Sequence, residues 1–383
     1  MNRQALKRIA ALCCCTAALL FPCCAAARMA PQQTQQAFDM LLAASVGTQA
    51  PAGGSEAAAQ WLQAQLGQSA AQQSQTLPQT VPESILPETA PASPPASDIQ
   101  ALIDAIPEAR RAPIDEVHYA ASSTAEGYFF YGEGCLRNAS AQNTLTLTEQ
   151  AAEPLARSFD ANSDEPQVLI VHTHTTESYD PNDIGIYDTE HPTRSTADGE
   201  NMLAVGAALC AQLQSMGIAA VQATEYHDYP SYNGAYSRSR ETVRQYLLRY
   251  PSVKVVLDLH RDGIQREDGT RVKPTAVIDG RKAAQLMLVV NADDGSGSMP
   301  YEMENLRFAA RLQDALQRRY PGLARPALFD ERKYNQDLMP GYLLVEVGSE
   351  SSTLEEAKYS AALLANCLAD VLTQSSGTAA GTL

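Results

Sequence analysis

The sequence predicts an α/β protein in which a mixed, largely parallel sheet is flanked by helices on both faces. Two observations lead to this fold class. Short apolar runs such as QVLIV (167–171) and VKVVLDL (253–259) show no alternation of polar and apolar residues, which is typical of strands buried on both faces. Amphipathic segments separate these runs, and strands that alternate with helices form largely parallel sheets.

The expected elements follow one another from the run at 167–171 onward. Glu200 to Met216 is a predicted helix, because its apolar residues recur at helical spacing until a glycine ends it. Before the main domain, a helix is expected at 99–109 and strands at 127–132 and 143–149. The later elements are strands at 218–223, 253–259, 284–290 and 341–348 and helices at 237–250, 301–319 and 354–373.

The N-terminus has the pattern of an export signal. Lys7 and Arg8 precede an uncharged stretch from Ile9 to Ala27. The length of this stretch suits a membrane span, whereas Pro22 and the Ala-x-Ala ending favour cleavage, so residues 1–28 are a signal peptide or a transmembrane anchor. In both cases the remainder is expected outside the cytoplasm, held at the cell membrane or secreted.

Composition divides the rest of the chain. The segment after the export signal is rich in Gln, Ala, Ser and Pro, which cannot bury enough surface to fold, and it is expected to be a flexible tether with a short helix at 60–66. The segments are a tether at 29–98, an N-terminal extension at 99–162, a catalytic domain at 163–375 and a disordered tail at 376–383.

Charge and cysteine content exclude other classes of protein. The net charge is −16 and no basic cluster occurs beyond the first eight residues, which argues against a nucleic-acid partner. Five of the eight cysteines precede residue 25. The others, Cys135, Cys210 and Cys367, have no C-x-x-C spacing, so we expect small buried side chains and neither a zinc ribbon nor a disulfide framework.

Ionisable residues stand where several expected strands end, and ligands of α/β proteins gather beyond the carboxyl ends of strands. The first strand of the main domain leads to His172 and His174, and a later strand leads to His260. Glu346 lies inside the apolar run GYLLVEVG. Burying an unpaired carboxylate there would cost several kcal/mol of folding free energy. Glu200 begins a helix, a place that the helix dipole also favours for an acid.

Two histidines and a carboxylate on separate elements, with a second carboxylate, fit a catalytic zinc centre with three protein ligands and a position for water. Zn²⁺ would lower the pKa of that water and polarise a carbonyl, and the remaining Glu would move the proton to a leaving nitrogen. Taken singly, each histidine is also explained by hydrogen bonding in a loop. His118, His191 and His227 lie in polar contexts and are expected at the surface.

Long strings of the sequence strengthen the hydrolase interpretation: VLIVHTHTTESY, YDTEHPTRSTADGENMLAVG, HDYPSYNGAYSRS, VVLDLHRDG and YNQDLMPGYLLVEVGSESSTLEEA. Over roughly residues 165 to 372, they resemble the stage II sporulation protein P family, which is related to zinc-dependent N-acetylmuramoyl-L-alanine amidases. The resemblance implies a mixed sheet flanked by helices. The positions that match the family pattern are the zinc ligands His174, Glu200 and His260 and the catalytic Glu346.

Two alternatives accompany this ligand set. His174 is preferred over His172, because the amidase histidine comes two residues beyond the strand, and His172 would lie nearer the sheet and hold the loop. Glu177, only three residues from His174, is the alternative carboxylate to Glu200. One departure concerns the substrate: the family tends to carry a His-Pro-aromatic element where this chain has Met299 in GSGSMPYEMENL.

The resemblance also implies an activity and partners. The reaction would be hydrolysis of the amide between N-acetylmuramic acid and L-alanine of the stem peptide, with cleavage of peptide cross-links as a second activity. The implied partners are peptidoglycan, stage II sporulation proteins D and M, and the membrane through the N-terminal segment. The alternative is an inactive amidase-like subunit that binds the wall or acts as a scaffold of the engulfment machinery.

Overall fold

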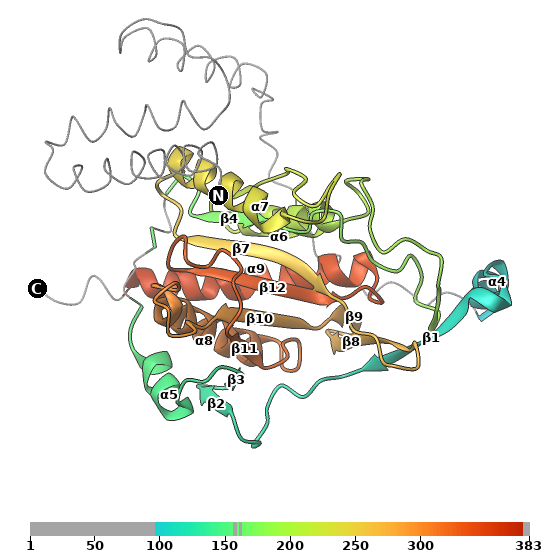
Figure 1. Ribbon diagram of the computed structural model, residues 1–383, viewed down its shortest axis with the longest axis horizontal. Coiled ribbons are helices and arrows are strands. Elements are labelled where there is room, and N and C mark those ends of the chain that lie inside the picture. The colour runs from blue at the N-terminus through green and yellow to red at the C-terminus, as the bar shows by residue number, and fades with distance from the viewer. Residues whose placement is uncertain (1–95, 156–158, 161–162, 378–383) are drawn as a thin grey trace, which may run out of the picture. The chain divides into compact units, whose positions relative to one another are not determined.

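The structure, a computed structural model, describes residues 96–155, 159–160 and 163–377 (Figure 1). The predicted export segment, the helix at 60–66 and nearly all of the tether lie outside the described residues. Within the described residues, no helix combines the length and apolar character needed to cross a membrane.

An eight-stranded sheet forms the centre of the described part (Figure 1). All pairs of neighbouring strands run parallel except β2–β3 and β10–β12. The prediction of an α/β fold with a mixed, largely parallel sheet is therefore confirmed. Across the sheet, the strands are β2 (Tyr128–Tyr131), β3 (Gly134–Asn138), β11 (Ala327–Asp330), β10 (Leu286–Asn291), β12 (Tyr342–Ser349), β7 (Val255–Asp262), β4 (Val168–Val171) and β6 (Ala220–Gln222).

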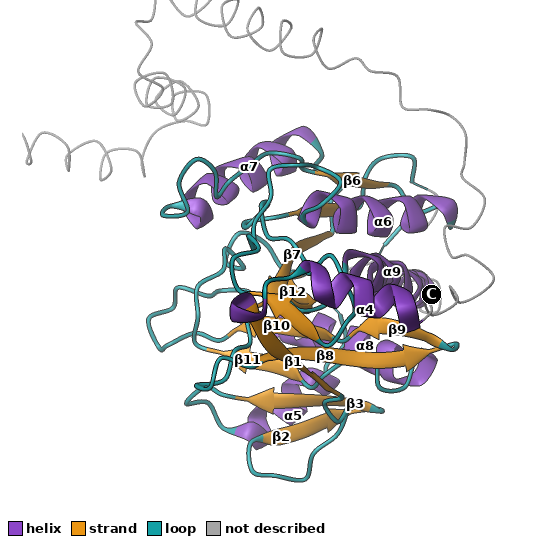
Figure 2. Ribbon diagram, turned by 90° about the vertical axis from the view of Figure 1, so that its right-hand side faces the viewer, coloured by secondary structure: helices purple, strands orange, loops and turns teal. Residues whose placement is uncertain are grey.

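Helices pack on both faces of this sheet (Figure 2). One face carries the main core, in which alternate residues of the central strands pack against α6 (Met202–Ser215), α8 (Glu302–Arg319) and α9 (Leu354–Gly377). The opposite face carries a smaller apolar cluster under α7 (Ala235–Arg249). Side chains along a strand alternate between faces, so β7 places Asp258 and His260 on the α7 face, in line with Val256 of the smaller cluster.

A second sheet, of four strands, was not predicted. Its strand β8 (Arg271–Ile278) packs against the end of the central sheet, where the hydroxyl of Ser349 donates to the carbonyl of Val272 at 2.7 Å. None of its strands carries a long apolar run, because polar residues interrupt the two longer strands and the other two have only three or four residues. In order across the sheet, they are β5 (Ile186–Asp188), β1 (Arg111–Val117), β8 (Arg271–Ile278) and β9 (Arg281–Ala284).

The predicted helices and strands of the main domain are present with small shifts of their ends. The strand predicted at 143–149 is wrong: this segment is α5 (Thr144–Ala152), because the side chain of Asn143 accepts hydrogen bonds from two backbone N–H groups and caps the helix. The expected helix near the start is α4 (Ala96–Ala105), followed by the 3-10 turn η1 (Glu108–Arg110). Cys135, Cys210 and Cys367 are buried and free, as expected.

Candidate metal centre

Three threonines anchor the loop that follows β4. Thr173 donates its backbone N–H and its hydroxyl to Asp258, at 2.8 and 2.6 Å. Thr176 does the same with Asp228, its hydroxyl lying 2.6 Å from Oδ2. The hydroxyl of Thr175 lies within 2.9 Å of two backbone carbonyls. These contacts explain the threonine hydroxyls of HTHTTE: they satisfy a buried loop and fix its course.

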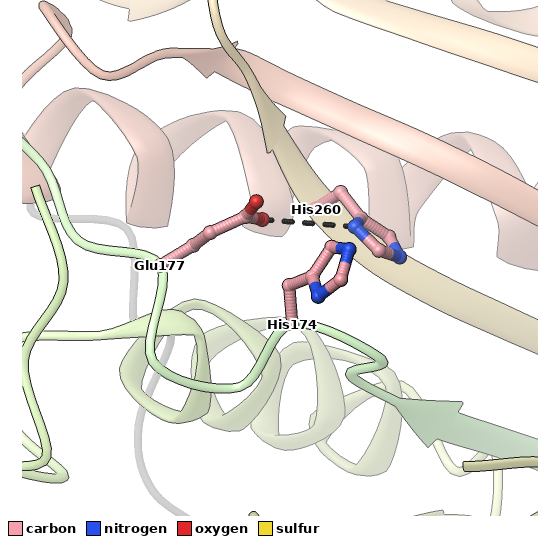
Figure 3. Close-up of side chains that lie close together, drawn as sticks. All are labelled: His174, Glu177 and His260. Carbon is pink, nitrogen blue, oxygen red and sulfur yellow. Dashed lines mark ion pairs between the residues drawn. The ribbon is translucent and has the colours of Figure 1, made fainter. Parts of the chain in front are cut away.

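The anchored loop brings two side chains toward β7. His174, Glu177 and His260 lie with one potential ligand atom each within 4.8 Å of one another (Figure 3). All three are buried, with 7%, 6% and 3% of their surface exposed. Nδ1 of His174 has no hydrogen-bond partner among the described residues. Because a buried polar atom left unpaired is costly, this convergence fits a bound cation, and two imidazoles with a carboxylate suit zinc.

The electrostatics of His174 and Glu177 favour metal binding. Burial and the nearby positive charges of His260 and Arg194 lower the pKa of His174 to about 4, which leaves its imidazole neutral at pH 7. Burial tends to raise the pKa of Glu177, but His260 and Arg261 outweigh it and lower the pKa to about 2. A neutral imidazole and a carboxylate are the forms that bind a metal ion.

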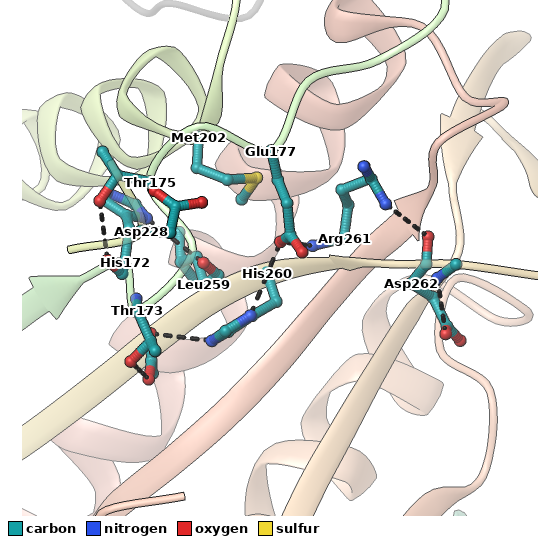
Figure 4. A network of polar contacts seen from close by, with 12 residues as sticks. His172, Thr173, Thr175, Glu177, Met202, Asp228, Leu259, His260, Arg261 and Asp262 are labelled. Carbon is teal, nitrogen blue, oxygen red and sulfur yellow. Dashed lines mark hydrogen bonds and ion pairs between the residues drawn. The ribbon is translucent and has the colours of Figure 1, made fainter. Parts of the chain in front are cut away.

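His260 is held between two carboxylates. Its Nδ1 lies 3.6 Å from Oε2 of Glu177, and its Nε2 lies 3.1 Å from Oδ1 of Asp258. Burial would lower the pKa of His260, but these two acids outweigh it and raise the pKa well above its usual value. The contacts of Glu177 and Arg261 around this ring are part of a wider polar network (Figure 4).

Glu346 lies beside this group without being part of it. It occupies the position of β12 that pairs with His260 of β7 in parallel register. Its Oε2 is buried and has no hydrogen-bond partner among the described residues. Burial raises the pKa of Glu346 to about 8, opposed by the positive charge of His260. A carboxyl group with a pKa near neutrality is suited to proton transfer.

The structure does not bring Glu200 to the two histidines. Glu200 is exposed and precedes Asn201, whose side chain caps α6. The carboxylate of Glu200 accepts a hydrogen bond from the hydroxyl of Ser195 at 2.8 Å. The carboxylate that lies with the two histidines is Glu177, the alternative in the sequence interpretation, because the loop after β4 turns it toward His260.

His172 is buried beneath the loop. Its Nδ1 lies 3.4 Å from the carbonyl of Leu259, and its Nε2 lies 2.9 Å from the amide nitrogen of Gln222. Gly206 of α6 leaves room for the ring, since a Cβ there would lie 2.5 Å from Nε2. His172 thus occupies the place expected for a residue that holds the loop against the sheet.

The prediction that His227 lies at the surface is wrong. His227 is 2% exposed, and its Nδ1 lies 2.7 Å from the carbonyl of His172, so it packs under the same loop. His118 and His191 are exposed, as expected. Met299, which stands in place of the family's histidine, is buried.

Aromatic side chains that sequence reasoning did not single out surround His174. Tyr232 stacks on its ring with centroids 4.6 Å apart, and Tyr236 meets it edge-on at 5.5 Å. The guanidinium of Arg194 lies over the ring of Tyr232, 4.8 Å from its centroid. Tyr232 is 55% exposed, so it borders the candidate centre on its solvent side. The signal in the sequence was the tyrosine-rich string HDYPSYNGAYSRS.

Known proteins resemble this chain in sequence. Residues 111–369 match the family described as Stage II sporulation protein P (SpoIIP). Stage II sporulation protein P of Bacillus subtilis is 32% identical over 222 residues, which cover 55% of this chain and 51% of that protein. The chain therefore spans about half the length of this curated relative.

Solved structures show weaker similarity. The N-acetylmuramoyl-L-alanine amidase AmiC2 of Nostoc punctiforme is 13% identical with a TM-score of 0.33, covering 54% of this chain and 97% of that one. The catalytic domain of CwlV, an N-acetylmuramoyl-L-alanine amidase from Bacillus (Paenibacillus) polymyxa, is 10% identical with a TM-score of 0.30, covering 54% and 98%. The sequence matches carry the assignment: the chain belongs to the stage II sporulation protein P family.

Proposed function

We propose that this protein is a zinc-dependent peptidoglycan hydrolase that cleaves the amide between N-acetylmuramic acid and L-alanine of the stem peptide. The observation that carries the proposal is the buried group of His174, Glu177 and His260 with Glu346 beside it. Its unpaired buried atoms are explained by a metal ion and a substrate. Membership of the family adds the sporulation context.

The residues of the candidate centre have separate roles in the proposed reaction. His174, Glu177 and His260 would hold Zn²⁺, which when bound lowers the pKa of a water molecule and polarises a carbonyl. Glu346, in its ionised form, takes the proton of the attacking water and delivers it to the leaving nitrogen, a role that suits its position beside His260 on the neighbouring strand. Arg261 holds the carboxylate of Glu177 in place by donating its backbone N–H to Oε2 at 3.2 Å.

We also propose where the protein acts and with which partners. Residues 1–28 would be a signal peptide or membrane anchor, and residues 29–98 a tether that lets a domain at the membrane reach the wall. The protein would thus act outside the cytoplasm on peptidoglycan, together with stage II sporulation proteins D and M. Cleavage of peptide cross-links would be a further activity of the same centre.

The test pairs metal analysis with product analysis. The full-length protein, purified in detergent, is assayed for bound zinc and incubated with purified peptidoglycan beside its Glu346→Gln variant. We expect about one zinc per chain and free stem peptides from the wild type alone. Zinc-loaded, folded protein that releases no stem peptides would instead favour a noncatalytic wall-binding or scaffold subunit, and peptides cut only at cross-links would mark an endopeptidase.

A further inference from the structure

We propose that Asp258 is a positioning residue that sets the geometry of both histidines of the candidate metal centre. The inference rests on the metal centre of the proposed function and does not depend on which bond of peptidoglycan is cleaved. Asp258 is fully buried in β7 and was not among the predicted site residues.

The first contact of Asp258 is with His260, two residues further along the same strand. Both side chains lie on the face of the sheet that carries α7, because side chains two residues apart in a strand point the same way. Oδ1 of Asp258 lies 3.1 Å from Nε2 of His260, a close contact whose alignment falls short of a hydrogen bond. This contact leaves Nδ1 as the nitrogen that faces Glu177, at 3.6 Å.

The second contact reaches the other histidine through the chain. Asp258 accepts the backbone N–H of Thr173 at 2.8 Å and its hydroxyl at 2.6 Å, and Thr173 directly precedes His174. The hydroxyl of Ser239 on α7 lies 2.7 Å from that of Thr173, which joins the helix to the same network. One carboxylate therefore constrains a ring in the strand and a loop far from it in sequence.

In metal sites, a carboxylate placed like Asp258 orients the ligating histidine. A ligating histidine is held in one tautomer and one orientation when its other nitrogen donates to a carboxylate, and loss of that partner typically costs about 10- to 100-fold in metal affinity. Oδ1 of Asp258 stands in the place of that carboxylate, 3.1 Å from Nε2 of His260. Through Thr173 it also limits the freedom of His174, so both imidazoles are oriented before a metal ion arrives.

The experiment separates the two contacts. Asp258→Asn keeps an oxygen that can accept from Thr173 but removes the charge that faces His260. Thr173→Val removes the hydroxyl contacts to Asp258 and Ser239 and keeps the backbone N–H contact to Asp258. The matched control is Asp228→Asn: Asp228 is another buried acid that anchors the same loop, at Thr176, and it touches neither histidine. Zinc affinity is measured by competition with a chelator, and ligand geometry by the visible absorption of the Co²⁺-loaded full-length protein.

We expect Asp258→Asn to lower zinc affinity by about 10- to 100-fold and to change the cobalt spectrum. The zinc affinity of Thr173→Val should fall by less than that of Asp258→Asn. The zinc affinity of Asp228→Asn should fall by less than about threefold, and its cobalt spectrum should be unchanged. Equal losses for Asp258→Asn and Asp228→Asn, or wild-type affinity in Asp258→Asn, would overturn the proposal. Wild-type protein that binds zinc but leaves peptidoglycan intact would count against the proposed function and leave the role of Asp258 standing.

Discussion

Among the clusters of buried charge in the described residues, the one around Lys273 and the candidate metal centre are completed in different ways. Lys273 on β8 has 2% of its side chain exposed and pairs with Asp183 at 2.7 Å and Glu356 at 2.8 Å. Glu356 in turn accepts the backbone N–H of Thr353 in a capping box at the start of α9. At the candidate metal centre, by contrast, Nδ1 of His174 is left without a partner among the described residues.

This difference separates structural charge from functional charge. A buried ion whose partners all come from the protein is completed by folding alone. A group whose buried atoms converge on one point and remain unpaired needs something from outside the chain. We therefore expect substitutions in the Lys273 cluster to change mainly the stability of the protein. Substitutions in the group of His174, Glu177 and His260 should change mainly its affinity for a metal ion.

The largest effect is expected from Lys273→Met. Removing the cation leaves two acids without their buried partner, and such a change typically costs about 3–5 kcal/mol in the free energy of unfolding. Urea unfolding of the full-length protein measures the loss. The control is Lys282→Met, since Lys282 pairs with Asp183 at an exposed position, where ion pairs contribute about 0–1 kcal/mol. Equal losses in the two variants would erase the distinction between the buried and the exposed lysine.

The next effect concerns the carboxylate of the metal centre. Glu177→Gln removes a charged ligand, so zinc affinity should fall by more than the roughly 100-fold upper range for an orienting partner. Glu200→Gln should leave it unchanged, because Glu200 is exposed and bound to Ser195. Competition with a chelator measures both. If the Glu200 variant lost zinc and the Glu177 variant kept it, the ligand expected from the family resemblance would be restored.

A smaller effect tests whether the two clusters are independent. Zinc that binds only the folded protein stabilises it by about 2.7 kcal/mol at a free concentration 100 times its Kd. Thermal unfolding with and without zinc measures this gain. We expect the same gain in wild type and Lys273→Met, because the clusters share no residue, and a much smaller gain in Glu177→Gln. A gain that changed in Lys273→Met would show that the clusters are coupled.

The central strands were predictable, because runs such as VLIV are apolar on both faces and need no information from elsewhere in the chain. The second sheet was not, since strands such as IYD on β5 are short and half-exposed and depend on their neighbours.

The candidate site was also predictable only in part. His174 and His260 follow or end strands, so their meeting at one edge was predictable. The choice of Glu177 over Glu200 was not, because it depends on the shape of a loop that is anchored through Thr173 by Asp258, 85 residues away. No local pattern in the sequence carries that contact.

The smallest effect tests the structural cluster by acid. Burial raises the pKa of Asp183, but hydrogen bonds and charge from Lys273 and Lys282 outweigh it and hold the pKa below its usual 3.8. Since the folded protein binds this proton less readily than the unfolded chain, the stability from Asp183 is complete above about pH 3.8 and is lost as the pH falls below that value. Urea unfolding should therefore show a steeper loss as the pH falls from about 4 to about 2.5 in wild type than in Asp183→Asn. Parallel profiles would mean that Asp183 contributes no acid-sensitive stability.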